Sequence, residues 1–168
     1  MTDSQQTVGR CDQQPNSRWC FVCGIENPCG LKIRFHNDGY HRSLARVTLG
    51  EQYQSYPGIV HGGILTTILD ETMGRAILAE DGSDDISQAR FMFTVKMETR
   101  FRKSVPLNEE FIVRGRVEQD RGRMVQVSGE VVLGDGMVAV EASATLVTIP
   151  PEQVDQMLSY DVGWKVYP

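Results

Sequence analysis

Apolar and polar residues alternate along much of the chain, as they do in half-buried β-strands. The stretches LKIRFH (31–36) and RSLARVTLG (42–50) predict two strands joined as a hairpin. Between residues 91 and 149 four longer strand-like stretches follow, separated by the turn signals PLN, DRG and GDG. The pattern therefore predicts an antiparallel sheet of about five to six strands.

One segment, residues 62–79, departs from this alternation and repeats its apolar residues at the spacing of an α-helix. The apolar half of this helix consists of Ile64, Leu65, Ile68, Leu69, Met73 and Ala76. An antiparallel sheet with a single long helix can bury both apolar surfaces by curling around that helix. We expect an α+β fold in which the sheet wraps around one long central helix.

The chain of 168 residues suits one folded domain, which we place at residues 19–150. Residues 1–18 are polar and lack the apolar stretch of a signal peptide, so we expect a flexible tail there. Residues 151–168 form a C-terminal extension that could add a short amphipathic turn. Residues 81–85, DGSDD, read as a polar loop after the helix.

The net charge of −5 gives no general attraction to nucleic acid or to anionic lipid. No apolar run approaches the roughly 18 residues that a membrane span needs. We therefore expect a cytoplasmic protein without a nucleic acid or membrane partner.

Four cysteines lie within the first thirty residues, namely Cys11, Cys20, Cys23 and Cys29. Their spacing is compatible with disulfides, a metal site or plain thiols, and disulfides are the least favoured without a secretory signal. Zinc could take Cys20, Cys23 and Cys29 with His36 or His41, but the second half of a strong zinc motif is missing. We expect small, partly buried thiols and no metal.

The expected helix begins at His61-Gly62-Gly63. A helix N-terminus offers unpaired backbone N–H groups at the positive end of the helix dipole, which could hold a developing oxyanion. Glycine has no Cβ, so a substrate carbonyl can approach that backbone closely. The simpler alternative is that the glycines only permit a tight entry and that His61 caps the helix or orients the loop.

Two adjacent acids lie inside the same helix. Glu71 stands four residues before Arg75, which predicts a surface salt bridge. Asp70 has no cation at helical spacing and lies at the margin of the apolar half, where a carboxylate is only partly solvated. Asp70 is therefore our candidate for activating water or attacking a substrate, and an ordinary helix acid is the alternative.

The HGG at the helix start with an acid nine residues after the histidine resembles the hotdog-fold acyl-CoA thioesterases. The similarity is to the phenylacetate-pathway type and its relatives among the 4-hydroxybenzoyl-CoA thioesterases. The leader CFVCGIENPCGL (20–31) resembles a stretch that precedes the first strand in a subgroup of bacterial members. The resemblance covers about residues 20–148.

This resemblance implies hydrolysis of an acyl- or aryl-CoA thioester without a metal or an organic cofactor. It implies that Asp70 acts as base or nucleophile, that Gly62 and Gly63 hold the oxyanion, and that His61 positions the substrate carbonyl. It also implies a homodimer with the site between subunits, and it is compatible with a dimer of dimers.

Thr94 matches a position where relatives carry a hydroxyl that assists the attacking water. Strict alternation instead groups Thr94 with Lys96 and Glu98, away from the apolar face, so a surface role is equally compatible.

Coenzyme A carries several phosphate charges, so an acidic protein needs a local basic patch to bind it. The candidates are Arg100, Arg102 and Lys103 at one strand end and Arg121 and Arg123 around a turn.

Three other functions compete with hydrolysis. A non-catalytic binder of acyl-CoA or a related apolar acid could use the same fold. A hydratase would want an Asn-Pro-x-His helix start, but Asn27-Pro28 is followed by Cys29-Gly30. A small zinc-dependent interaction domain would rest on the cysteines alone.

Overall fold

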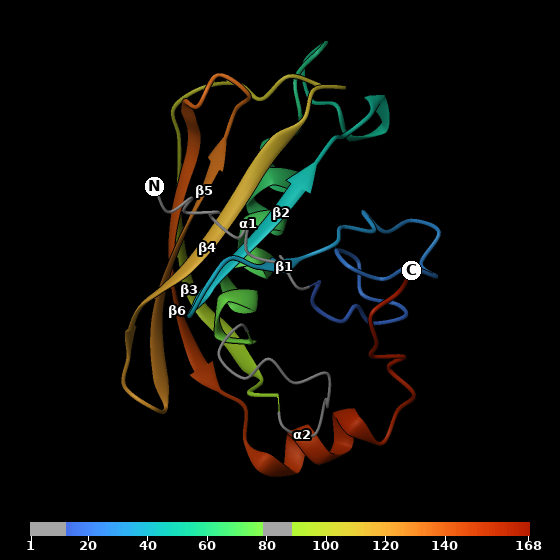
Figure 1. Ribbon diagram of the computed structural model, residues 1–168, viewed down its shortest axis with the longest axis vertical. Coiled ribbons are helices and arrows are strands. Elements are labelled where there is room, and N and C mark those ends of the chain that lie inside the picture. The colour runs from blue at the N-terminus through green and yellow to red at the C-terminus, as the bar shows by residue number, and fades with distance from the viewer. Residues whose placement is uncertain (1–12, 79–88) are drawn as a thin grey trace, which may run out of the picture.

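The computed structural model describes residues 13–78 and 89–168, and it shows a six-stranded antiparallel sheet packed against one long helix (Figure 1). The helix α1 spans Gly62–Leu78 and contacts every strand from β2 to β6, as expected for a sheet that curls around it. The strands are β1 (His36–Asn37), β2 (Arg42–Val47), β3 (Met92–Phe101), β4 (Phe111–Asp120), β5 (Met124–Val132) and β6 (Val138–Thr148). The predicted α+β architecture of an antiparallel sheet around one long helix is confirmed.

The strands follow the order β1-β2-β4-β5-β6-β3, so β1 and β3 form the two edges of the sheet. The turn signals of the sequence lie between the strands as expected. The polar loop predicted at residues 81–85 lies outside the described residues. No helix in the described part of the chain is long and apolar enough to cross a membrane.

The first predicted strand, residues 31–36, is only partly realised, because β1 begins at His36. Ile33 and Phe35 are buried as the alternation requires. However, the N–H groups of Leu31 and Ile33 donate to the carbonyls of Phe21 and Val22 in the cysteine loop. The stretch therefore pairs with the N-terminal segment, and only its last residue reaches β2.

Residues 13–18 fall within the expected tail, but they pack against the domain. The Asn16 amide is fully buried and donates to the carbonyls of Cys23 (2.8 Å) and Ile33 (3.0 Å). The Gln14 amide donates to the carbonyl of Arg75 at 3.1 Å. These buried polar contacts tie the segment to the sheet and to α1, whereas residues 1–12 lie outside the described residues.

The expected C-terminal turn is the short helix α2 (Pro151–Leu158). A separate 3-10 turn, η1 (Glu51–Tyr53), lies between β2 and α1. After α2 the chain returns to the N-terminal segment, where the backbones of Asn16 and Lys165 pair. Gln14 and Trp164, from the described parts of these two segments, thus both contact Arg75 of α1.

A pair of glycines lets α1 lie close to the sheet. Gly115 of β4 and Gly129 of β5 are register partners. A Cβ on Gly115 would stand 2.5 Å from the carbonyl oxygen of Thr72, and a Cβ on Gly129 would stand 2.9 Å from Cγ of Met73. Ser43, which is paired with Gly115, donates its hydroxyl to the same Thr72 carbonyl at 2.5 Å.

Gly115→Ala should therefore push α1 away from the sheet and destabilise the fold by about 1–3 kcal/mol, the usual cost of overpacking a core. Thermal unfolding measures the change. Gly134→Ala is the matched control, because a Cβ there meets nothing within 4 Å. Equal melting temperatures for the two variants would contradict this account of the helix contact.

Candidate active site

Asp70 and Thr94 face each other between α1 and β3. The Thr94 hydroxyl donates to Oδ1 of Asp70 at 2.7 Å, and the Asp70 side chain is half-buried. Strict alternation along β3 placed Thr94 on a face with Lys96, but the register shifts between these two residues. A bulge adds a residue to one strand and so resets its facing, which lets the exposed Thr94 reach Asp70 although alternation groups it with Lys96.

Asp70 and Thr94 line a cavity of about 350 Å³. Its walls also include Cys20, Cys23, Glu71, Gly74, Arg75, Met92, Met157 and Trp164. The N-terminal loop, α1, β3 and the C-terminal extension therefore all contribute to one cavity. Trp164 and Met157 were not anticipated as site residues, because nothing in their local sequence indicates that the extension folds back onto α1.

The start of α1 lies at the other end of β3. The Gly63 N–H donates to Nδ1 of the exposed His61 ring at 2.9 Å, so His61 caps the helix as the simpler alternative held. A Cβ on Gly62 would stand 3.2 Å from the Phe101 ring, which gives this glycine a packing reason as well. Within the described residues the Gly62 N–H has no hydrogen-bond partner.

The helix start and the acid are too far apart to act together within one chain. Gly62 and Asp70 are eight residues apart on α1, which corresponds to about 12 Å along a helix axis. A single thioester carbonyl and its attacking water span only a few ångströms, because reacting atoms start about 3–3.5 Å apart. Within one chain, the candidate oxyanion donor and the candidate base therefore belong to two separate places.

Glu71 and Arg75 form the expected i,i+4 pair, with Nε donating to Oε1 at 2.9 Å, but the prediction that it lies on the surface is wrong. Arg75 is only 2% exposed. Its Nη1 donates to the carbonyl of Pro15 at 2.5 Å, and its guanidinium lies over the rings of Phe35 and Trp164. Helical periodicity could not show this, because Pro15 and Trp164 come from distant segments that contact Arg75.

A family model described as "Thioesterase superfamily" matches residues 57–140, which is half of the chain. The chain belongs to the thioesterase superfamily. The matched region runs from the loop before α1 into β6 and includes the HGG, Asp70 and Thr94. The resemblance inferred from these residues is thereby confirmed at the level of the superfamily.

Individual relatives of this superfamily member are distant. The mouse protein acyl-coenzyme A thioesterase THEM4 is 26% identical over 84% of this chain and 59% of its own length, so the chain spans about three fifths of that relative. The crystal structure of protein RHA08564, a thioesterase superfamily protein, is 28% identical with a TM-score of 0.68, covering 77% of this chain and 63% of that one. The PaaI protein from the phenylacetic acid degradation operon of Escherichia coli shares the fold, at 13% identity and a TM-score of 0.61 over 71% and 81% of the two chains.

The basic residues predicted to hold coenzyme A divide into two groups in this thioesterase-superfamily chain. Arg100, Arg102 and Lys103 lie around Phe101, beside the start of α1. Arg123 lies at the other end of β3, since its carbonyl accepts the N–H of Thr148, the register partner of Met92. Ten residues of strand span about 30 Å, so Arg121 and Arg123 do not join the first group within one chain.

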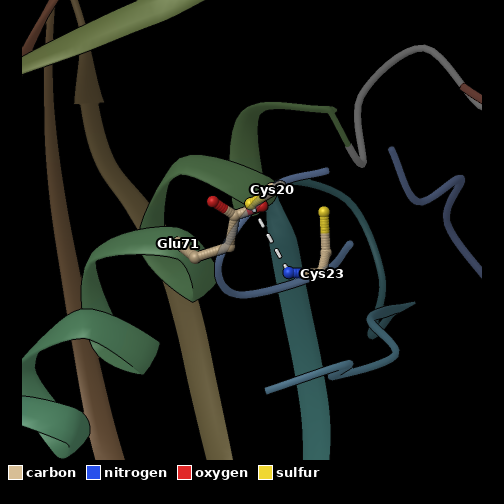
Figure 2. A group of neighbouring side chains, drawn as sticks. All are labelled: Cys20, Cys23 and Glu71. Atoms are coloured by element: carbon tan, nitrogen blue, oxygen red, sulfur yellow. Dashed lines mark hydrogen bonds between the residues drawn. The ribbon is translucent and has the colours of Figure 1, made fainter. Parts of the chain in front are cut away.

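Two of the cysteines considered as possible zinc ligands do meet, but with an acid that the sequence did not suggest. Cys20, Cys23 and Glu71 bring their ligand atoms within 4.8 Å of one another (Figure 2). A hydrogen bond from the Cys20 thiol, together with the Arg75 guanidinium, lowers the pKa of Cys23 to about 6. Cys29 is exposed and lies outside this cluster, as do His36 and His41, and Cys11 is not among the described residues.

Proposed function

We propose that the chain is an acyl-CoA thioesterase that hydrolyses an acyl- or aryl-CoA thioester to the free acid and coenzyme A, working as a homodimer. The observation that carries the proposal is the Asp70–Thr94 pair in a cavity beside β3. Membership of the thioesterase superfamily and the similarity to mouse acyl-coenzyme A thioesterase THEM4 support it.

Asp70 has the position that a general base needs. Thr94 donates to Oδ1, which orients the carboxylate and leaves Oδ2 to accept a proton from water. The water oxygen would then attack the thioester carbon while the carbonyl oxygen becomes an oxyanion. When this intermediate collapses, the carbon–sulfur bond breaks and the coenzyme A thiolate takes up a proton. The same carboxylate could instead attack the carbon directly.

The oxyanion would lie at the N-terminus of an α1 helix, where the Gly62 N–H is available and the helix dipole favours negative charge. Because this point is about 12 Å from Asp70 along the helix, the donor must come from a second subunit. His61 accepts a hydrogen bond from the Gly63 N–H and would thereby position the backbone at the start of α1.

The exposed edge of β3 is the surface that would join the two subunits. Within the described residues β3 pairs only with β6, and its apolar side chains Phe93, Val95 and Phe101 are about half exposed. A ten-residue edge strand with exposed apolar residues invites pairing with another strand.

A two-fold axis would pair β3 with the β3 of a second subunit in antiparallel orientation. The start of one β3 would then lie beside the end of the other. This arrangement brings Asp70 and Thr94 of one subunit to the helix start of its partner. It also brings Arg121 and Arg123 of one subunit toward Arg100, Arg102 and Lys103 of the other, which would give coenzyme A a continuous basic surface.

A non-catalytic acyl-CoA binder is the second candidate. The observation in its favour is that the Gly63 N–H is already occupied by His61, which leaves fewer donors for an oxyanion. Only turnover separates the two functions. A panel of short, long and aromatic acyl-CoAs should release free thiol if the protein is an enzyme, and binding of the same compounds without thiol release would favour the binder.

Complementation tests whether the site is shared between subunits. Asp70→Asn removes the base and Gly62→Val blocks the helix start, so each variant alone should lose at least ~10²-fold in kcat. After mixing and subunit exchange, half of the dimers are mixed and each carries one intact site, so about a quarter of the parent activity should return.

The matched control mixes Asp70→Asn with the double variant Asp70→Asn/Gly62→Val. Every site then lacks the carboxylate, and activity should stay at the background level. Mass spectrometry of the intact dimers verifies the exchange. If exchange occurs and the first mixture stays inactive, the site does not combine Asp70 and Gly62 from different subunits.

A further inference from the structure

The cavity beside Asp70 holds a second cluster of chemically reactive side chains, formed by Cys20, Cys23 and Glu71. In Figure 2 Glu71 reaches from α1 toward the loop that carries both cysteines. We propose that this cluster is a binding site for a soft divalent metal ion, with zinc as the expected occupant. The proposal is independent of the proposed hydrolysis, which needs no metal.

The distances within the cluster suit zinc. The three ligand atoms lie within 4.8 Å of one another. Zn–S bonds of about 2.3 Å and Zn–O bonds of about 2.0–2.2 Å in a tetrahedron place ligand atoms roughly 3.4–3.8 Å apart. The ligand atoms would therefore have to close by up to about 1.0–1.4 Å to complete the site. Two thiolates and one carboxylate form a donor set that zinc accepts readily.

The backbone of the cysteine loop is also arranged for a sulfur ligand. The N–H groups of Val22 and Cys23 point at Sγ of Cys20, at 3.3 and 3.5 Å. These two contacts fix the position of the Cys20 sulfur within the turn. The loop needs glycine after Cys23, because a Cβ on Gly24 would stand 2.2 Å from the carbonyl oxygen of Cys20. The sequence CFVCG thus folds into a tight turn that presents both sulfurs on one side.

The charges around the cluster also balance when a divalent cation is bound to two thiolates. Arg75 is buried, it pairs with Glu71, and its Nη2 has no hydrogen-bond partner in the described chain. Two thiolates and Glu71 carry three negative charges, and Zn²⁺ with the Arg75 guanidinium carries three positive charges. The hydrogen bond from Nε of Arg75 to Oε1 of Glu71 would orient the carboxylate toward the metal, as outer partners of metal ligands commonly do.

Such a site would fasten the loop 20–23 to the middle of α1. The fourth position would be taken by water or by Ser17, whose hydroxyl lies 3.6 Å from Sγ of Cys23. This site differs from the zinc site that the cysteine spacing suggested, in which Cys29 and a histidine would join Cys20 and Cys23 as ligands. The sequence could not suggest Glu71, because its spacing to Arg75 already explained it as an ion pair.

The experiment uses the full chain without a histidine tag. Zinc is measured by elemental analysis after purification, and Co²⁺ is titrated into the metal-free protein to look for sulfur-to-cobalt charge-transfer absorption. We expect about one metal ion per chain in the parent and in Cys29→Ser, the matched control with an exposed cysteine outside the cluster. Cys20→Ser and Cys23→Ser should each bind at least ~100-fold more weakly, and Glu71→Gln roughly 10–100-fold more weakly.

A second measurement keeps the test independent of how the variants fold. Zinc should protect two cysteines of the native parent from alkylation, and a chelator should expose them and lower the melting temperature. A parent that shows no cobalt absorption would overturn the proposal, as would unchanged metal affinity in Cys20→Ser. The purified parent could instead contain a disulfide between Cys20 and Cys23 and bind no metal after reduction. That result would overturn the metal site and would indicate that the two cysteines form a redox-active pair.

Discussion

Asp70→Asn should lower kcat for acyl-CoA hydrolysis by at least ~10²-fold, the usual size of general-base assistance. Asparagine keeps the shape of the side chain and can still accept the hydrogen bond from Thr94, but it cannot take a proton from water. The change removes an interaction made in the transition state, so KM should change little. Steady-state release of free thiol from an acyl-CoA measures both constants.

Asp155→Asn on the exposed side of α2 is the matched control and should hydrolyse the substrate at the parent rate. Circular dichroism and the oligomeric state show whether each variant is folded. Glu71→Gln is not a neutral comparison, because Glu71 neutralises the buried Arg75. If folded Asp70→Asn retains the parent kcat, Asp70 is not the base and the binder function gains support.

Arg75→Met should destabilise the fold by about 3–5 kcal/mol, since removal of one partner from a buried ion pair leaves the other charge uncompensated. Arg75 holds Glu71, the carbonyl of Pro15 and the ring of Trp164 together, so both chain ends should loosen at the same time. For a chain of this size the loss corresponds to a fall in melting temperature of roughly 6–20 °C.

Arg46→Met is the matched control. Arg46 also pairs with an acid, Glu110, but both side chains are more than half exposed, and such pairs contribute about 0–1 kcal/mol. The double variant Arg75→Met/Glu71→Gln should recover part of the loss, because it removes the unpaired carboxylate as well. An Arg75→Met protein that melts with the parent would show that the buried pair does not hold the chain ends.

The sequence alone was sufficient for the parts of this protein that depend on local periodicity. Alternating residues predicted the four long strands, and the helical spacing predicted α1 to within a residue of its described end. The position of Asp70 at the margin of the apolar half also followed from helix geometry, because neighbours three and four residues away determine that margin. The HGG at the helix start and the acid nine residues after the histidine identified the superfamily, because both lie within one short segment of the sequence.

The tertiary structure alone decided every feature that depends on residues distant in the chain. A bulge in β3 turns Thr94 toward Asp70, although alternation placed it on the other face. The packed segment 13–18 and the returning C-terminal extension bury Arg75, which helical spacing had placed at the surface. Glu71 meets Cys20 and Cys23 for the same reason. Local patterns specify which face of a helix or strand is apolar. Which other segment covers that face is determined by long-range packing, and the sequence of a single helix or strand does not contain that information.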